Sequence, residues 1–150
     1  MLKQLKTIGL GGTFDRLHEG HRLFLDTAAH YGQFIHIGLI TSGYLNQKRK
    51  TLHYKIESYD TRRKNVENYF FHRKTPITIA DISNIDMDRN LASDASLSAL
   101  VVSQETILGA IAINKLRKEQ NKEKMTIIVV PRVIRDDGSL VSSTRLRKEE

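Results

Sequence analysis

The chain has 150 residues, no cysteine and a formal net charge of +7, with 39% hydrophobic and 27% charged residues. These values are typical of one globular domain over residues 1–150, and the lack of cysteine excludes disulfides, a thiolate nucleophile and a thiolate metal site. No apolar run reaches membrane-spanning length and no signal-peptide pattern opens the chain, so we expect a cytoplasmic protein that does not act on membranes.

Short apolar runs alternate with amphipathic segments along the whole chain. Strands are predicted over Lys6–Leu10, Phe34–Ile40, Pro76–Ala80, Ala99–Val102 and Met125–Val130. Helices are predicted over Glu19–Tyr31, from Ser58 to about His72, from Thr106 to about Gln120 and from about Val141 onwards. Residues 41–58 and 81–98 are predicted to be irregular, with one helical turn in the second. The alternation predicts an α/β fold: a single doubly wound, Rossmann-like domain with a five-stranded parallel sheet.

Most of the positive charge lies in one segment. Between Tyr44 and Lys74 there are nine basic and three acidic residues. Lys48, Arg49 and Lys50 follow the second predicted strand, and open α/β sheets bind ligands at the carboxyl ends of their strands. These cations therefore either contact an anionic ligand or form a solvated surface. On the following helix, Arg62, Arg63 and Lys64 are predicted to form an exposed basic side.

Paired glycines, Gly11 and Gly12, separate the first predicted strand from the first predicted helix. Without a Cβ they let the backbone approach a bulky anion, and free N–H groups at the start of the helix favour negative charge. Thr13 adds a hydroxyl, and His18 and His21 are spaced to face one side of the helix. These residues predict a phosphate site. The alternatives are a plain turn and a zinc site, and zinc is disfavoured because no cysteine or nearby carboxylate pair completes a ligand set.

A second group of phosphate-type residues lies near the end of the chain. Three hydroxyls in a row precede two arginines: Ser142, Ser143, Thr144, Arg145 and Arg147. One such hydroxyl could simply cap a helix, but three with two arginines exceed what a cap needs. Right-handed crossovers place the loops after the first, fourth and fifth strands near one another, so the two groups are expected to converge.

Both groups carry a family resemblance. The stretch GGTFDRLHEGH at residues 11–21 resembles the H-x-G-H signature of a nucleotidyltransferase superfamily that transfers AMP or CMP to a phosphate-bearing acceptor. The stretch VSSTRLR at residues 141–147 resembles the I-S-S-T-x-x-R signature of the same superfamily. Residues 99–106 and 113–117 are similar to phosphopantetheine adenylyltransferases of the archaeal and eukaryotic type. That family makes dephospho-coenzyme A and pyrophosphate from ATP and 4′-phosphopantetheine.

The resemblance implies a role for each site residue. Catalytic roles fall to His21, Thr13 and Lys48, and binding of 4′-phosphopantetheine to Thr13, Lys48 and Arg49. The residues implied in ATP binding are Gly12, Thr13, Phe14, His18, His21, Ser142, Ser143, Thr144 and Arg147. Mg²⁺ is expected to arrive with ATP, with no dedicated metal ligands from the protein. Because the acceptor phosphate is already an anion, we expect in-line transfer without a general base or a covalent intermediate.

Two other functions remain open at this stage. A sister enzyme of the same superfamily, such as a cytidylyltransferase or another adenylyltransferase, would share both signatures. A basic nucleic-acid-binding domain would explain the charge between Tyr44 and Lys74, but aromatic residues for base stacking are not clustered with those charges. We therefore expect no nucleic-acid partner. The oligomeric state is not predicted.

Overall fold

A five-stranded sheet, all of whose strands are parallel, forms the centre of the computed structural model, which describes residues 5–48, 55–84, 87–134 and 137–138. The strand order is β3-β2-β1-β4-β5. The strands are β1 (Leu5–Gly12), β2 (Gly32–Ile40), β3 (Ile77–Ile82), β4 (Ala99–Val102) and β5 (Thr126–Val129). The helices are α1 (Glu19–Tyr31), α2 (Ser42–Lys48), α3 (Tyr59–Phe70), α4 (Met87–Ser93) and α5 (Ile107–Glu119).

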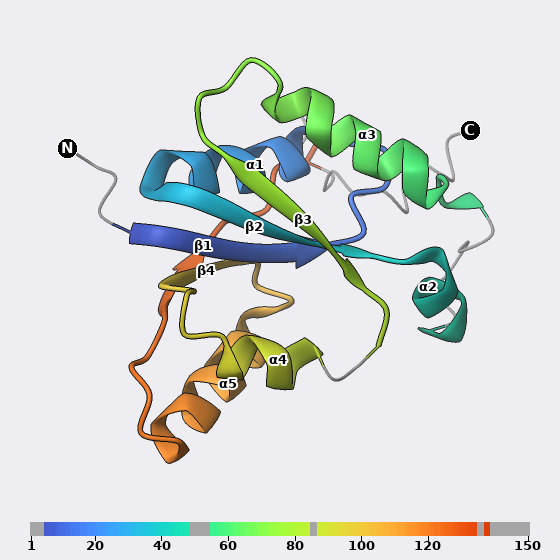
Figure 1. Ribbon diagram of the computed structural model, residues 1–150. Helices are drawn as coiled ribbons and strands as arrows, with labels where there is room; N and C mark the ends of the chain where they lie inside the picture. Colours follow the sequence, from blue (N-terminus) through green and yellow to red (C-terminus); the bar gives the residue numbers. More distant parts are fainter. Residues whose placement is uncertain (1–4, 49–54, 85–86, 135–136, 139–150) are drawn as a thin grey trace.

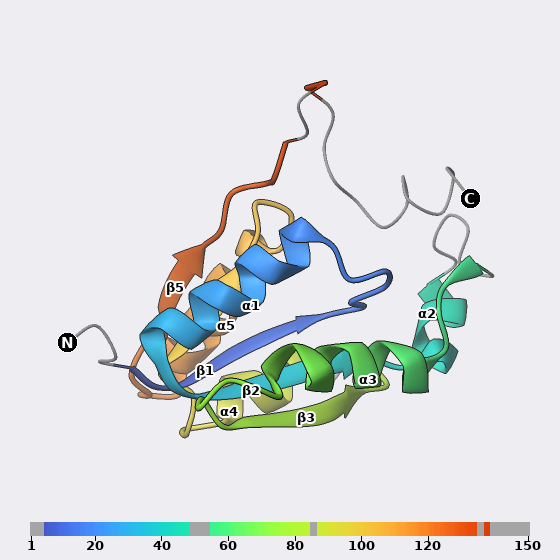
Figure 2. The ribbon, with the colours of Figure 1, turned by 90° about the horizontal axis from the view of Figure 1, so that it is seen from above.

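The helices cover both faces of the sheet. In Figure 1, α1 and α3 lie on one face and α4 and α5 on the other. Figure 2, seen from above, shows α1 and α3 side by side along the first face. The chain changes face between the neighbouring central strands β1 and β4, which is the place where open α/β sheets bind ligands. The predicted doubly wound α/β fold is confirmed, and the stretch between β1 and α1 lies at this switch point.

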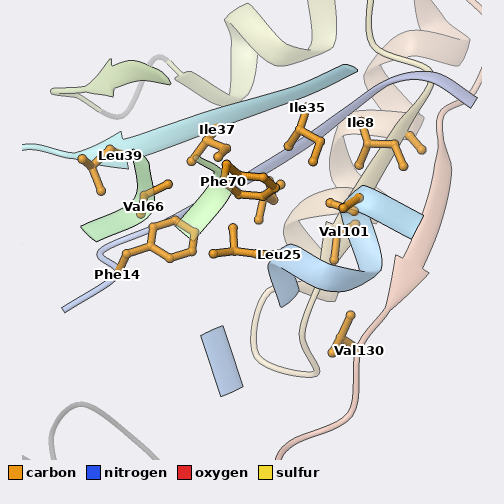
Figure 3. Packing of buried hydrophobic residues seen from close by; sticks show 14 residues of the cluster. Ile8, Phe14, Leu25, Ile35, Ile37, Leu39, Val66, Phe70, Val101 and Val130 are labelled. Atoms are coloured by element: carbon orange, nitrogen blue, oxygen red, sulfur yellow. The ribbon is translucent and has the colours of Figure 1, made fainter. Parts of the chain in front are cut away.

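The larger hydrophobic core fills the space between the sheet and the helices α1 and α3. Figure 3 shows Phe14, Leu25, Val66 and Phe70 gathered against Ile37 and its neighbours on the strands. A smaller cluster lies on the opposite face around α5, formed by Ala92, Leu97, Leu100, Val102, Ala110, Ile113 and Met125. Phe14 belongs to the connection after β1 and is only 3% exposed, so this connection is anchored in the core. None of the helices in the described part of the chain is long and apolar enough to cross a membrane.

Two predicted irregular segments contain helices. α2 occupies the beginning of residues 41–58, and α4 is longer than the single turn predicted within residues 81–98. Thr41 directly precedes α2 and caps it: its carbonyl accepts from the Leu45 N–H at 3.1 Å and its hydroxyl from the Tyr44 N–H at 3.3 Å. Leu45 is 1% exposed. Burial of this one side chain supports a helix whose own sequence shows no amphipathic period.

The buried faces also differ from the prediction at two places. The helical spacing of apolar residues predicts an inward face of α1 formed by Leu23, Phe24, Thr27, Ala28 and Tyr31. In the structure Leu25, Ala28 and Ala29 are buried, whereas Tyr31 is 38% exposed. Leu25, Ala28 and Ala29 pack in the core between α1 and the sheet, so the buried stripe of the helix is centred on them. The continuous apolar run from Met125 to Val130 predicts a buried strand, but β5 is an edge strand of the described sheet, and its Val129 is 44% exposed.

Candidate active site

The connection between β1 and α1 is held in a strained backbone conformation. Phe14 has φ +52° and Arg16 has φ +46°, both in the left-handed region that residues with a Cβ avoid. Each such residue costs about 1–2 kcal/mol, so the surrounding structure must hold it in place. The Phe14 side chain contributes by packing in the core, 5.4 Å between ring centroids from the imidazole of His21. Because this ring is buried, any contact of Phe14 with ATP falls to its backbone.

His18 caps the N-terminus of α1 with its imidazole. Its Nδ1 accepts from the backbone N–H groups of Gly20 at 3.1 Å and His21 at 3.4 Å. The sequence predicted that N–H groups at this helix end would be available to a ligand, whereas two of them bind the His18 ring. The N–H groups of Gly20 and His21 are therefore already bonded within the chain.

His21 completes the cap, because its side chain accepts a hydrogen bond from the backbone of His18. Its Nδ1 accepts from the backbone N–H of His18 at 3.3 Å, so the two residues form a capping box with imidazoles in place of the usual hydroxyl and carboxylate. The two rings stack with centroids 3.8 Å apart and planes 16° apart. Burial, followed by the neighbouring His18, lowers the pKa of His21 to about 3, while Asp15 acts in the raising direction. His21 is therefore neutral at physiological pH.

These hydrogen bonds assign the tautomer of both rings. A nitrogen that accepts a hydrogen bond carries no proton, so each neutral imidazole holds its proton on Nε2. For His18 the backbone N–H groups polarise the ring through Nδ1, and this strengthens Nε2–H as a donor. The arrangement gives α1 two neutral N–H donors of the kind that phosphate oxygens accept.

The position of the His18 imidazole explains why residue 20 is a glycine. A Cβ at this position would stand 2.9 Å from Cε1 and 3.1 Å from Nδ1 of the His18 imidazole. Real Cβ atoms essentially never come this close to another heavy atom, so a side chain here would push the ring off the helix end. The H-x-G-H spacing therefore follows from the capping geometry.

A buried carboxylate ties the same connection to the segment before α3. Asp15 is fully buried and pairs with the Arg16 guanidinium at 2.9 Å. Its Oδ1 also accepts from the backbone N–H of Glu57 at 2.9 Å, and Glu57 Oε1 accepts from the backbone N–H of Arg16 at 2.6 Å. No local pattern in the sequence indicates a role for Asp15, Arg16 and Glu57. Glu57 lies 42 residues after Asp15, and only the fold brings the two together.

Arg62 was predicted to be exposed and is fully buried instead. Its Nη1 donates to the carbonyl oxygens of Thr13 at 2.9 Å and Ile40 at 2.7 Å, and its Nε to that of Glu57 at 3.0 Å. Burial lowers its pKa, and the negative charges of Asp15 and Glu57 oppose that shift. One signal was present in the sequence: Arg62 lies four residues, about one helical turn, before the apolar Val66, so it falls on the same side of the helix. Arg63 and Lys64 were also predicted to be exposed. Lys64 is exposed, and Arg63 forms a surface ion pair with Glu67.

The structure brings part of the predicted site together. Gly12, Thr13, Phe14, His18 and His21 lie in or beside the connection at the switch point. Lys48 is the last residue of α2, which follows the carboxyl end of β2 (Figure 1). The side chain of Lys48, and the residues Arg49, Lys50, Ser142, Ser143, Thr144, Arg145 and Arg147, lie outside what the structure describes.

Carboxylates at the site are already engaged. Asp15 accepts from Arg16 and Glu57, and Glu57 accepts from Arg16. Among the described residues there is no group of three or more His, Cys, Asp or Glu side chains that could hold a metal ion. The donors for anions that the described part of the site offers are therefore the imidazole N–H groups of His18 and His21.

The chain is similar to known proteins in both sequence and fold. A family model described as cytidylyltransferase-like matches residues 10–149. The chain is 33% identical over 150 residues to a phosphopantetheine adenylyltransferase of Methanothermobacter thermautotrophicus, covering 100% of this chain and 88% of that protein. It is 31% identical over 148 residues to the protein of the same name from Methanopyrus kandleri, covering 99% and 92%. The crystal structure of an Archaeoglobus fulgidus protein of unknown function has a TM-score of 0.67 and 32% identity, covering 83% of this chain and 88% of that one.

Proposed function

The chain belongs to the cytidylyltransferase-like family and, within it, to the phosphopantetheine adenylyltransferases, and from this membership we propose that it transfers AMP from ATP to 4′-phosphopantetheine. The products are dephospho-coenzyme A and pyrophosphate, so this cytoplasmic enzyme would act in the synthesis of coenzyme A. An oxygen of the acceptor phosphate forms a bond to the α-phosphorus. The bond from the α-phosphorus to the oxygen bridging to the β-phosphorus breaks, and pyrophosphate leaves with the electron pair.

The observation that supports this proposal most directly is the histidine capping box. It holds two neutral imidazoles, each with its proton on Nε2, at the N-terminus of α1 and at the switch point of the sheet. Negative charge grows on the oxygens of the α-phosphate as the acceptor approaches. Donors held in advance where charge develops lower the barrier without reorganising during the reaction. The depressed pKa of His21 keeps it a hydrogen-bond donor without making it a proton donor.

We assign the roles of the residues from the resemblance to the two family signatures and, for Thr13, His18 and His21, also from their position in or beside the connection after β1. His21 and Thr13 stabilise the α-phosphate as charge develops, and His18 binds phosphate oxygens of ATP. Lys48, with Arg49 beside it, joins the acceptor phosphate to the α-phosphate. Ser142, Ser143, Thr144 and Arg147 bind the β- and γ-phosphates, and Gly12 and the Phe14 backbone border the nucleotide. No residue acts as a general base, since the attacking oxygen carries no proton to remove.

Mg²⁺ is proposed to enter with the triphosphate. When bound, it would supply positive charge to the leaving pyrophosphate, and the phosphate oxygens themselves would be its main ligands. The donors of the described site fit this arrangement. Its buried carboxylate, Asp15, is committed to Arg16 and Glu57, and imidazole N–H groups bind anions.

The test is pyrophosphate release by the purified chain with either ATP or CTP, Mg²⁺ and a panel of phosphate-bearing acceptors. We expect release only with ATP and 4′-phosphopantetheine together, with dephospho-coenzyme A identified by mass spectrometry. Release with CTP and glycerol phosphate, and none with ATP and 4′-phosphopantetheine, would reassign the chain within its family. Duplex DNA binding clearly tighter than about micromolar, the upper range of ordinary non-specific binding, would favour the nucleic-acid alternative.

A further inference from the structure

The buried guanidinium of Arg62 connects three separate parts of the chain. It donates to the Thr13 carbonyl in the connection after β1, to the Ile40 carbonyl at the end of β2, and to the Glu57 carbonyl before α3. Its Nη2 also contacts the Ser42 hydroxyl, at 3.4 Å, in the first turn of α2. One rigid, planar group therefore fixes the separation between the connection after β1 and the beginning of α2.

That separation matters for the reaction proposed above. Thr13, on one side of Arg62, is proposed to bind the α-phosphate. α2, on the other side, ends at Lys48, which is proposed to bind the acceptor phosphate. In-line attack requires the two phosphates to be held at the correct distance, and a displacement of about 1 Å can cost 10²-fold in rate.

We infer that Arg62 is a positioning residue that sets the distance between the ATP side and the acceptor side of the active site. This inference rests on the proposed function, but Arg62 itself touches neither substrate in it. A lysine could retain the charge at this position. It cannot bond to Thr13, Ile40 and Glu57 together, because its single ammonium lacks the planar fork of the guanidinium.

The experiment compares Arg62→Lys with Arg63→Lys. Arg63 is the next residue of α3 and forms a surface ion pair with Glu67 at 2.9 Å, so its substitution is the matched control. For Arg62→Lys we expect kcat for pyrophosphate release to fall by about 10–10²-fold, with KM for ATP within about threefold, because alignment is lost while ground-state binding is kept. Arg63→Lys should keep both constants.

A second readout does not depend on activity. Amide hydrogen exchange should accelerate in Arg62→Lys over residues 11–16 and 41–45 together, while β4 and α5 exchange as in the unsubstituted chain. A variant with normal kcat overturns the inference. The inference is also overturned if amide exchange in Arg62→Lys rises evenly over the whole molecule and kcat falls only in proportion to the unfolded fraction.

If Arg62→Lys fails to fold, the Ser42→Ala variant tests the positioning role of Arg62 instead. It removes only the hydroxyl that faces Nη2, at an exposed position in the first turn of α2. A fewfold loss of kcat with faster exchange over residues 41–45 supports the inference, and unchanged values overturn it. If the unsubstituted chain releases no pyrophosphate with any acceptor, the proposed function fails. The exchange comparison then still shows whether Arg62 couples the two segments.

Discussion

His18 and His21 bind each other through backbone and side chain in both directions. The backbone N–H of each residue donates to Nδ1 of the other, at 3.3 Å and 3.4 Å, and the two imidazoles stack 3.8 Å apart. One set of contacts thus caps α1, fixes both tautomers and places two N–H donors at the helix end. The imidazoles of His18 and His21 thus have both a structural role and a proposed catalytic role. The substitutions described below separate the two roles.

His21→Gln should fold normally and lose most of its activity. Glutamine at this position can still accept from the His18 N–H, as in an ordinary capping box, but its amide does not reproduce the imidazole Nε2–H. Loss of one preorganised donor costs about 10²–10³ in kcat, and ATP affinity should stay close to normal because the contact strengthens only in the transition state. Steady-state kinetics and calorimetric ATP binding measure the two effects. Full specific activity in the folded variant would leave His21 a purely structural residue.

His18→Asn and His18→Ala should differ in stability and agree in activity. Asparagine is a strong N-cap residue, whereas alanine leaves the Gly20 and His21 N–H groups without their acceptor. We expect His18→Ala to lose about 0.5–2 kcal/mol of unfolding free energy relative to His18→Asn. Both variants should bind ATP more weakly and turn over slowly, because neither retains the imidazole donor. Urea denaturation and ATP titration check this, and an active His18→Asn would limit His18 to capping.

The low pKa of His21 predicts a stability change on the acid side. The folded pKa is about 3, against 6.5 for an ordinary histidine, so between these values the unfolded chain binds more protons than the folded one. The contribution of His21 is therefore complete above about pH 6.5 and is lost as pH falls towards 3. Urea denaturation at pH 6.5, 5.5 and 4.5 should give a steeper fall in the unsubstituted chain than in His21→Gln, by up to about 1.4 kcal/mol per pH unit. Equal slopes would contradict the assigned burial of a neutral imidazole.

Gly20→Ala should inactivate the protein while Gly109→Ala should not. Both glycines lie in helices, where alanine is favoured by about 1 kcal/mol. A Cβ at Gly20 meets the His18 imidazole at 2.9 Å, whereas a Cβ at Gly109 meets nothing within 4 Å. We expect Gly109→Ala to raise the melting temperature and keep kcat, and Gly20→Ala to lose both the gain in stability and most of the activity. Equal stabilisation and equal activity of the two variants would show that His18 can adjust at no cost.

Asp15→Asn should destabilise the protein far more than removal of a surface ion pair. Asp15 is fully buried against Arg16, and asparagine keeps the bond from the Glu57 N–H but not the charge. We expect a loss of about 1.5–3 kcal/mol, the usual worth of a hydrogen bond to a charged group in a buried site. Arg63→Ala, which breaks an exposed pair with Glu67, should cost at most about 0.5 kcal/mol. Similar losses for the two variants, measured by urea denaturation, would contradict this ranking.

The sequence by itself determined the order of the five strands and of α1, α3 and α5, and the position of the first phosphate-type group. Alternating apolar runs and amphipathic segments predict parallel β and α elements, because buried parallel strands and one-sided helices have different hydrophobic periods. The glycines and the two histidines are local features, and their hydrogen bonds span only three residues. The H-x-G-H spacing is therefore visible before any tertiary contact is known.

Only the tertiary structure decided what holds that group in place. Arg62 contacts Thr13 across 49 residues and Asp15 contacts Glu57 across 42 residues, and the spacing that puts Arg62 on the same side of α3 as Val66 does not by itself show that its charge is buried. Arg62 is buried because backbone carbonyls from three segments meet at one point and solvate its charge, and that meeting point exists only once β1, β2 and α3 are assembled. α2 likewise forms around the burial of Leu45. A group of functional residues that lie within one helical turn can be predicted from the local sequence. How those residues are held in the fold depends on contacts between segments that are distant in the chain, and these contacts exist only in the folded structure.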